Sequence, residues 1–178
     1  MATLCYHVAT TVDGYIASTD GSWAAFLSEG PHIPDYLDAL DRYGSVVMGR
    51  RTYEVGLGHG VTNPYPKLAT YVLSTALGAS PDPAVTVVAD DAVAFIRAHK
   101  RDATRPIYLC GGSQLAGALF AAGLVDELII KQNPVVLGAG IPLFAGVTRA
   151  TPLALRDCRT YANGVVVTSF RVAAPAPT

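Results

Sequence analysis

The chain has 178 residues, of which 51% are hydrophobic and only 15% are charged, and its formal net charge is −1. A chain of this length can bury one full core, and so apolar a composition favours a sheet that is covered on both faces. The near-neutral charge, with no block of lysine or arginine, argues against nucleic acid or an anionic membrane as the partner.

Cysteine usage and the N-terminus indicate a cellular setting. Cys5, Cys110 and Cys158 are an odd set without the spacing of a zinc site, so we expect reduced thiols in a cytoplasmic protein and no metal site. Cys5 and His7 point the same way from one strand, but no companion ligand accompanies them. No basic segment followed by a long apolar core opens the chain, so we expect neither a signal peptide nor a membrane span.

The first two thirds of the chain alternate predicted strands with predicted helices. Strands are indicated by β-branched and apolar runs, and helices by apolar residues repeated every three or four positions. In chain order we predict a strand over 3–12, a turn at 13–14, a helix over 34–43, a strand over 45–48, a helix over 49–55, a loop over 56–66, strands over 70–74 and 85–89, a helix over 90–99, a strand over 106–110 and a helix over 113–122.

The last third is predicted to contain strands alone, over 128–130, 134–137, 153–155 and 165–170. Alternating elements followed by strands predict an α/β fold with a mostly parallel sheet and an antiparallel C-terminal edge. We expect one domain over 1–172 and a disordered Pro/Ala tail over 173–178. The late edge strands and the apolar composition predict a homodimer, because edge strands must be covered.

A pair of glycines, Gly111 and Gly112, joins a predicted strand to a predicted helix that begins with Ser113, Gln114 and Leu115. Glycine lets the backbone approach a ligand closely, and the free N–H groups of a helix N-terminus suit a phosphate. The alternative is an ordinary tight turn between a strand and a helix.

Two familiar catalytic motifs are absent. No G-x-G-x-x-G follows the first strand, and the glycines of 56–60 precede prolines instead of a helix, so we interpret them as a loop. Ser113 does not fit a serine hydrolase, since Leu115 replaces the final glycine of the nucleophile elbow. All four histidines also precede this serine in the chain.

Two further strand ends carry groups that suit an anion. Gly49, Arg50, Arg51 and Thr52 lie where a strand meets a helix, and the hydroxyls of residues 74 and 75 follow the next strand. Arginines at a helix N-terminus oppose the helix dipole unless an anion binds there. Because ligands of open α/β sheets bind at the carboxyl ends of the strands, the three ends predict a phosphorylated cofactor. The alternative is a pair of solvated surface arginines.

Taken in order, these segments resemble the dihydrofolate reductase-like superfamily, and most closely the branch that includes the reductase domain of bacterial riboflavin biosynthesis. The resemblance runs from about Thr3 to Val172. It rests on the ordered set of segments 11–17 (TVDGYIA), 47–54 (VMGRRTYE), 72–75 (VLST), 109–113 (LCGGS), 134–144 (PVVLGAGIPLF) and 163–167 (NGVVV).

The resemblance implies a three-layer fold with about eight strands and helices on both faces, and an NADPH-dependent oxidoreductase. It implies that Ala9 and Ile16 border the nicotinamide and that the loop at Asp13 closes over it. The remaining cofactor-binding residues that it implies are Gly49, Arg50, Arg51, Thr52, Ser74 and Thr75 near the 2′-phosphate, and Gly111, Gly112, Ser113, Gln114 and Leu115 around the pyrophosphate.

The substrate side departs from the family pattern. Dihydrofolate reductases carry a carboxylate on the first helix, and here that position falls at Ile33, which argues against folate. Asp35 and Asp38 are close but turn to different faces of the helix. The riboflavin enzyme needs cations for a ribose phosphate, and the region around His32 supplies no arginine.

We therefore expect a small-molecule substrate, a planar heterocycle of pterin or pyrimidine type or another C=N or C=O compound, reduced in the manner of 5-amino-6-(5-phosphoribosylamino)uracil. Tyr15, Trp23 and Tyr53 are candidates to pack on it, and Asp13 or a bound water is the candidate proton donor. Asp13 could equally be a structural turn residue. The alternative function is a nucleotide-binding module, a sensor or assembly subunit, without turnover.

Overall fold

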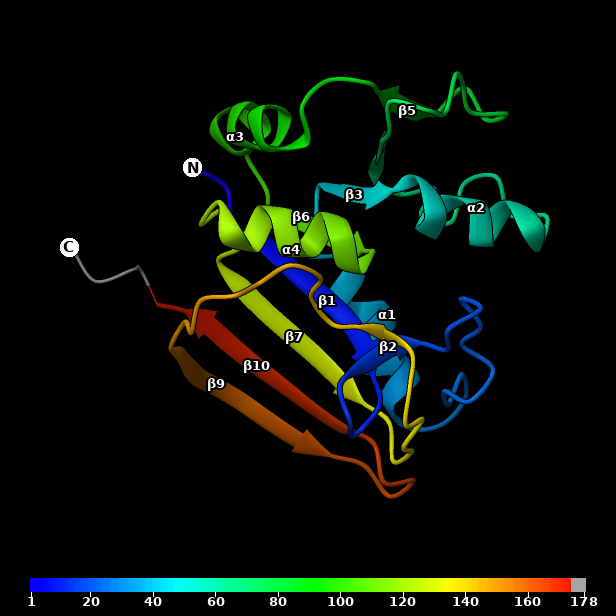
Figure 1. Ribbon diagram of the computed structural model, residues 1–178, viewed down its shortest axis with the longest axis vertical. Coiled ribbons are helices and arrows are strands. Elements are labelled where there is room, and N and C mark those ends of the chain that lie inside the picture. The colour runs from blue at the N-terminus through cyan, green and yellow to red at the C-terminus, as the bar shows by residue number, and fades with distance from the viewer. Residues whose placement is uncertain (174–178) are drawn as a thin grey trace.

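The computed structural model describes residues 1–173, and an eight-stranded sheet forms its centre (Figure 1). The strands are ordered β5-β4-β3-β6-β1-β7-β10-β9; β10 pairs antiparallel with both β7 and β9, and all other neighbouring strands of this sheet are parallel. The predicted fold class is therefore confirmed. The strands are β1 (Leu4–Thr10), β3 (Ser45–Gly49), β4 (Ala69–Leu73), β5 (Val85–Val88), β6 (Ile107–Gly111), β7 (Glu127–Gln132), β9 (Leu153–Thr160) and β10 (Val166–Val172), and a small second sheet pairs β2 (Tyr15–Ala17) with β8 (Ile141–Pro142).

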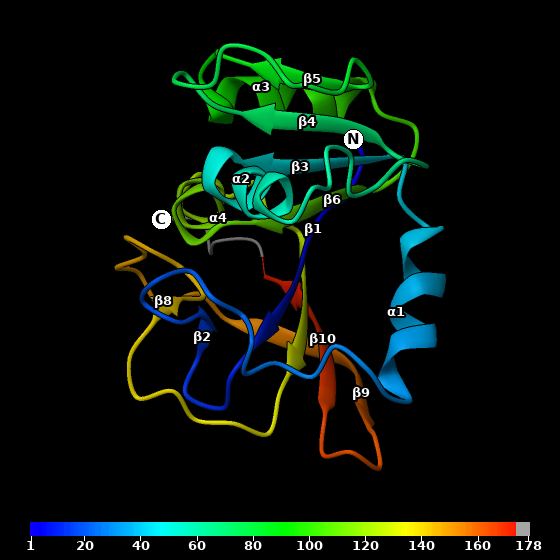
Figure 2. The same ribbon diagram turned by 90° about the vertical axis from the view of Figure 1, so that its right-hand side faces the viewer.

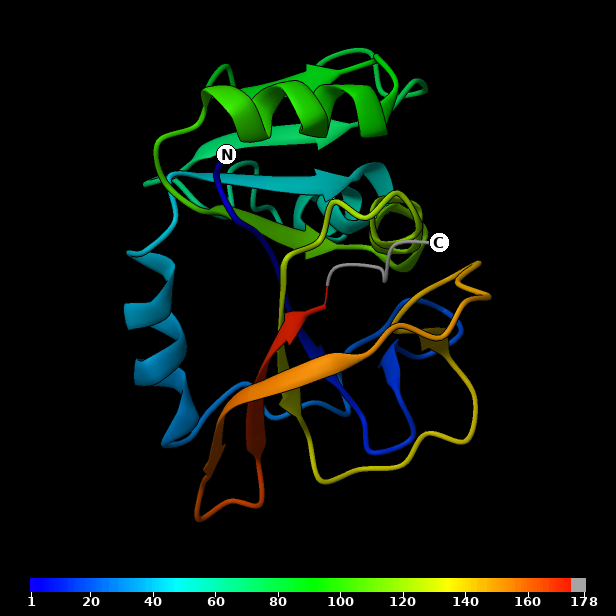
Figure 3. The ribbon, with the colours of Figure 1, turned by 90° about the vertical axis from the view of Figure 1, so that its left-hand side faces the viewer.

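Four helices cover the sheet from both sides. Figure 2 shows α2 in front of the sheet, and the opposite view in Figure 3 shows α3 in front of it. Of the tail predicted over 173–178, only Ala173 is described, where its N–H donates to the carbonyl of Pro152, and 174–178 lie outside the described residues. The helices are α1 (His32–Leu40), α2 (Arg50–Gly58), α3 (Ala92–Asp102) and α4 (Ser113–Ala121).

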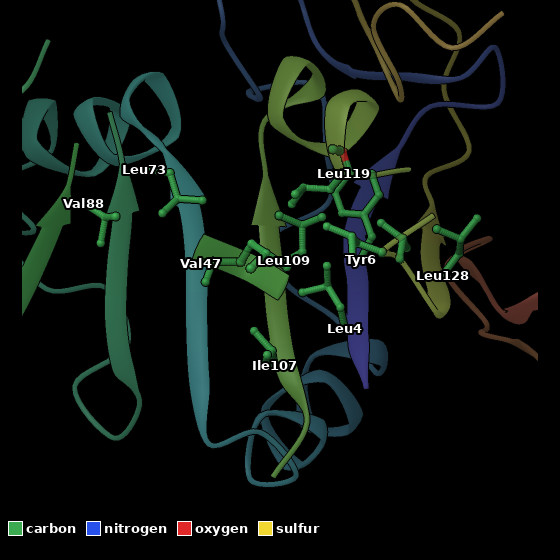
Figure 4. Packing of buried hydrophobic residues seen from close by; sticks show 13 residues of the cluster. Leu4, Tyr6, Val47, Leu73, Val88, Ile107, Leu109, Leu119 and Leu128 are labelled. Atoms are coloured by element: carbon green, nitrogen blue, oxygen red, sulfur yellow. The ribbon is translucent and has the colours of Figure 1, made fainter. Parts of the chain in front are cut away.

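Each face of the sheet has its own core, because successive residues of a strand point to opposite sides. On β1, Leu4 and Tyr6 join the core beneath α3 and α4, which Figure 4 shows, whereas Cys5 joins the core beneath α1 and α2. Central strands buried on both faces explain the apolar composition.

One predicted strand is absent, and several predicted boundaries differ from the structure. No strand forms over 134–137: the amide of Val135 bonds locally to the carbonyl of Asn133, and Val136 is exposed. Helix α1 begins two residues before Pro34, and α2 continues to Gly58, into the predicted loop. Within residues 1–173, no helix has the length and apolar character needed to cross a bilayer.

Helix α4 packs against the loop around Ala145 so closely that Gly117 has no room for a side chain. A Cβ on Gly117 would lie 1.9 Å from the carbonyl oxygen of Ala145, whereas a Cβ on Gly58 in α2 would have no atom within 4 Å.

We predict that Gly117→Ala lowers the free energy of unfolding by about 1–3 kcal/mol, because overpacking outweighs the gain in helix propensity. Gly58→Ala is the matched control and should leave this free energy unchanged, or raise it by less than about 1 kcal/mol. Urea unfolding followed by circular dichroism measures both. Equal stabilities of the two variants would contradict the close packing.

His7 is buried on β1 in the core beneath α1 and α2. Its ring contacts the rings of Tyr36 and Tyr108, and its Nδ1 lies 3.4 Å from the hydroxyl of Tyr43. Burial lowers the pKa of His7 from 6.5 to about 4. Between these two values the unfolded chain takes up a proton that the folded protein does not.

The contribution of neutral His7 to the free energy of unfolding should therefore be fully present above pH 6.5 and be lost as the pH falls toward 4, the pKa of folded His7. Between pH 7.5 and 5 the contribution of His7 to the loss is about 2 kcal/mol. His7→Gln should remove this part of the pH dependence, and replacement of the exposed His59 by glutamine should not. Denaturant unfolding at both pH values measures it, and parallel curves for wild type and His7→Gln would refute the assignment.

Candidate active site

The carboxyl ends of two neighbouring parallel strands, β3 and β6, lie side by side, and a helix begins directly after each of them. Met48 of β3 lies beside Gly111 of β6, and a Cβ on Gly49 would be 3.8 Å from the nitrogen of Gly112. Helices α2 and α4 start at the next residues, and no side chain caps either N-terminus. Figure 2 shows α2 and α4 near the carboxyl ends of these strands. Their free N–H groups and helix dipoles make this edge suitable for an anion.

The backbone at Gly112 lies close to helix α2. Gly111 has a φ of +128°, which favours glycine, and the peptide bond that joins it to Gly112 is cis. A Cβ on Gly112 would lie 3.2 Å from Oγ1 of Thr52, the hydroxyl that α2 contributes from its first turn. The two glycines and Thr52 therefore form a narrow cradle between the helix starts.

Ser113 adds an unused hydrogen-bonding group to this cradle. Its Oγ is buried and has no hydrogen-bond partner within residues 1–173. Buried polar groups are nearly always paired, so this hydroxyl fits the phosphate oxygen that the Gly-Gly-Ser motif predicted. Gln114 and Leu115 follow in the first turn of α4, the former exposed and the latter half-buried.

The two arginines of α2 differ in their partners. Arg50 pairs with Glu54 one turn later at 3.0 Å, whereas Arg51 is exposed and has no hydrogen-bond or ion-pair partner in the part of the chain that the structure describes. Only Arg51 is thus available to a phosphate without breaking an ion pair.

Residues 74 and 75 directly follow β4, which pairs with β3 so that Leu73 lies beside Gly49. The Oγ of Ser74 accepts hydrogen bonds from the amides of Ala76 and Leu77, and Thr75 is exposed. The structure therefore brings the three predicted strand ends together. Ser74 shapes its own turn there, and Thr75 presents an exposed hydroxyl.

Asp13 holds two loops together. Its carboxylate accepts a 2.5 Å hydrogen bond from the hydroxyl of Thr11 and further bonds from the amides of Leu137 and Gly138. The Thr11 bond, followed by these amides, lowers the pKa of Asp13, although residual desolvation opposes the shift. An aspartate that is ionised at neutral pH and occupied in this way organises the loop. Its role as a proton donor stays a hypothesis.

The other predicted nicotinamide neighbours lie on β1 and β2. Ala9 is half-buried near the end of β1 and pairs with Lys131 of β7, and Ile16 is half-buried on β2. The loop between them runs through Asp13.

The three aromatic residues proposed for the substrate separate in space. Tyr53 is fully buried in the core, where its hydroxyl donates to the carbonyl of Thr62. Tyr15 is half-buried on β2 beside Gly140. Trp23 is half-exposed and meets the ring of His59 edge-on at 6.0 Å. Only Trp23 lines the cavity described next.

A cavity of about 620 Å³ lies between the loop over 20–28 and the C-terminal half of α2. Trp23 and Phe26 form one wall, and Val55 and His59 form the other. These aromatic and apolar side chains share the lining with polar residues of the loop over 20–28.

Sequence reasoning missed two polar groups on the α1 side of the sheet. His32, the first residue of α1, is buried and faces β7, where its Nε2 lies 3.4 Å from Nζ of Lys131. Asp35, the acid considered from the sequence, bonds to neither of these two groups and accepts hydrogen bonds from Arg159 and Tyr161. One signal was present in the sequence: Lys131 lies two residues after the buried Ile129, so both side chains face the same side of the sheet.

A cluster of phenols lies deeper on the same face. The hydroxyls of Tyr36, Tyr65 and Tyr108 lie 3.4 Å from one another, and that of Tyr65 is 3.4 Å from Sγ of Cys110. Burial raises the pKa of all three tyrosines, so their hydroxyls are neutral. Within residues 1–173 no three histidine, cysteine or acidic side chains gather closely enough to hold a metal ion.

Comparison with solved structures places this arrangement in a known fold. A putative riboflavin biosynthesis protein from Shewanella sp. PV-4 matches 98% of this chain and 100% of its own, with a TM-score of 0.83 at 23% identity. Dihydrofolate reductase from Enterococcus faecalis, solved in complex with NADP(H) and RAB-propyl, matches 96% of each chain with a TM-score of 0.66 at 19% identity.

Sequence comparison identifies the family. The Bacillus subtilis protein YwjB is 33% identical over 162 residues, which cover 89% of this chain and 92% of YwjB. The family described as the RibD C-terminal domain matches residues 2–167. These matches span nearly the whole chain, and the chain therefore belongs to the RibD C-terminal domain family.

Proposed function

We propose that this protein is an NADPH-dependent reductase of a small planar heterocycle or a related C=N or C=O compound. The observation that carries the proposal is the cradle at the sheet edge, where two uncapped helix N-termini meet beside the unpartnered hydroxyl of Ser113. Membership of the RibD C-terminal domain family and the fold shared with an NADP(H)-bound dihydrofolate reductase support it.

Different residues of the chain would bind different parts of the cofactor. The first-turn amides of α4 and the hydroxyls of Ser113 and Thr52 suit the pyrophosphate, and Arg51 suits the 2′-phosphate. Ala9 and Ile16 would border the nicotinamide, which supplies the hydride when it is bound. The protein then orients the substrate, and the loop that Asp13 anchors excludes water.

A binding module without turnover is the second candidate. It is favoured by helix α1, where Ile33 stands at the position that the resemblance implies for a carboxylate and the buried residue beside it is a histidine, His32. Burial lowers the pKa of His32, and the nearby charge of Lys131 lowers it further.

We also propose that the protein forms a homodimer. The exposed edge strand β9, with Leu153 and Leu155 at its surface, is where a second copy would pair.

The 2′-phosphate assignment predicts a selective effect of one variant. Arg51→Gln should weaken NADPH binding about 10- to 100-fold, the loss typical of a charge-assisted hydrogen bond, and leave NADH binding unchanged. Quenching of the single tryptophan, Trp23, or cofactor fluorescence measures both affinities. Arg97→Gln, an exposed arginine of α3, is the matched control. Equal losses for NADPH and NADH would place the 2′-phosphate elsewhere.

The pyrophosphate assignment predicts the opposite pattern. Gly112→Ala fills the cradle beside Thr52, so it should weaken NADPH and NADH together by about tenfold or more. Urea unfolding of the same variant separates this effect from a general loss of structure. Unchanged affinities in a folded variant would remove the cradle from the cofactor site.

Turnover decides between the two candidates. Loss of NADPH absorbance with one or more members of a panel of pyrimidinediones, pterins, quinones and aldehydes is the expected result. NADPH binding with no oxidation across the panel would support the binding module. Absence of NADPH binding at micromolar concentrations would contradict both.

A further inference from the structure

Lys131 occupies an unusual position for a lysine. It lies on β7 beside Ala9 of β1, and the two side chains face the same side of the sheet, beneath α1. Neighbouring strands are about 4.8 Å apart, so the backbone of Lys131 lies one strand spacing from Ala9, the residue predicted to border the nicotinamide. Its stem is half-buried, and burial lowers its pKa.

The ammonium of Lys131 has only part of its hydrogen-bonding capacity filled. Nζ donates to the carbonyl of Leu27 at 2.7 Å. The ring of His32 also lies against it, but Nδ1 of His32 faces the amide nitrogen of Asn163 at 3.1 Å, and Nε2 is within 3.3 Å of the same Leu27 carbonyl. In this arrangement Asn163 donates to Nδ1 and Nε2–H donates to Leu27, so His32 offers Lys131 no acceptor.

No carboxylate balances this charge. Within residues 1–173 Lys131 forms no ion pair; Asp35 of α1 is bound to Arg159 and Tyr161, and Glu127 at the start of β7 is bound to Arg42. Partly buried cations are normally paired with an anion or an array of acceptors. Lys131 therefore has donors to spare on the face where a substrate would lie.

The loop that accepts the hydrogen bond of Lys131 also contributes to the cavity beside Trp23. Its acceptor, the carbonyl of Leu27, lies in the chain between Phe26 and Ser28, which both line that cavity. Lys131 therefore places an ammonium donor on the sheet face that carries Ala9, next to the loop that forms one side of the cavity.

We propose that Lys131, held by the Leu27 carbonyl and packed against His32, binds an oxygen acceptor of the substrate, so that the site selects planar compounds that present a carbonyl or carboxylate oxygen. Diaminopyrimidine-type compounds, which present N–H donors, are rejected because they would face an unpaired cation. This inference rests on the proposed function for the position of the nicotinamide.

The test uses two probes of similar size and opposite polarity. Orotate carries a carboxylate and two ring carbonyls, and 2,4-diaminopyrimidine presents amino donors. Calorimetric titrations of the full chain, with and without saturating NADPH, measure the affinity of each. We expect orotate to bind in the millimolar range or better, and 2,4-diaminopyrimidine to bind at least about tenfold more weakly.

Variants assign the effect to Lys131. Lys131→Met should weaken orotate binding about tenfold or more, with NADPH affinity unchanged. Lys131→Gln should do the same, and it retains a donor for Leu27, which protects the fold. Lys67→Met, at an exposed lysine beside Asp41, is the matched control and should change nothing.

Each outcome separates the inference from the proposed function. Three outcomes would overturn the inference, whether or not NADPH binds. They are orotate binding that survives both Lys131 variants, tighter binding of 2,4-diaminopyrimidine than of orotate, and no orotate binding at millimolar concentration. A chain that binds orotate through Lys131 but never binds NADPH retains the acceptor site and refutes the reductase.

Discussion

The structure depends on the meeting of two helix N-termini at one edge of a parallel sheet. Parallel β3 and β6 lie side by side, so the helices that follow them begin at neighbouring points. Neither N-terminus has a side-chain cap, and the dipoles of both helices place positive charge at the same edge. Such an arrangement is stabilised when an anion binds there. Gly111 has a φ of +128°, which favours glycine, and a Cβ on Gly112 would lie 3.2 Å from Oγ1 of Thr52.

The remaining elements divide the candidate site into the side proposed for the cofactor and the side proposed for the substrate. β3, β4 and β6 supply backbone amides and hydroxyls, which are suited to any phosphorylated nucleotide. Helix α1, β7 and the loop over 20–28 supply side chains with individual chemistry: the ammonium of Lys131, the ring of His32 and the wall at Trp23. The first side combines backbone amides with hydroxyl groups, whereas the second depends on the individual chemistry of its side chains, so the second is where a family can change its substrate without changing its fold.

The same division explains what could be predicted from sequence. The strands entering Gly49 and Gly111 are short apolar runs ended by glycine, and the helices after them have clear periodicity, so local pattern was enough to place the strand ends that meet at the candidate site. The fold class followed from the order of elements. The strand expected over 134–137 failed because residue type alone does not show whether a neighbouring strand is available for pairing, and Val135 bonds locally instead.

The substrate side could not be predicted in this way, because it depends on contacts between distant segments. Lys131 becomes informative only through its register with Ala9, and His32 only through the rotation of α1 toward β7. Asp35, the nearest acid by counting, is turned to the β9–β10 hairpin, where Arg159 and Tyr161 bind it. Tyr53 shows the converse: an aromatic residue close to a motif is buried in the core, with its hydroxyl bonded to Thr62.

The most direct test of the central claim is a crystal structure of the protein grown with NADPH. The account predicts that the pyrophosphate lies on the amides of residues 112–114, within hydrogen-bonding distance of the hydroxyls of Ser113 and Thr52, with the 2′-phosphate at Arg51. A cofactor bound in the cavity beside Trp23, or a pyrophosphate that leaves Ser113 without a partner, would contradict it.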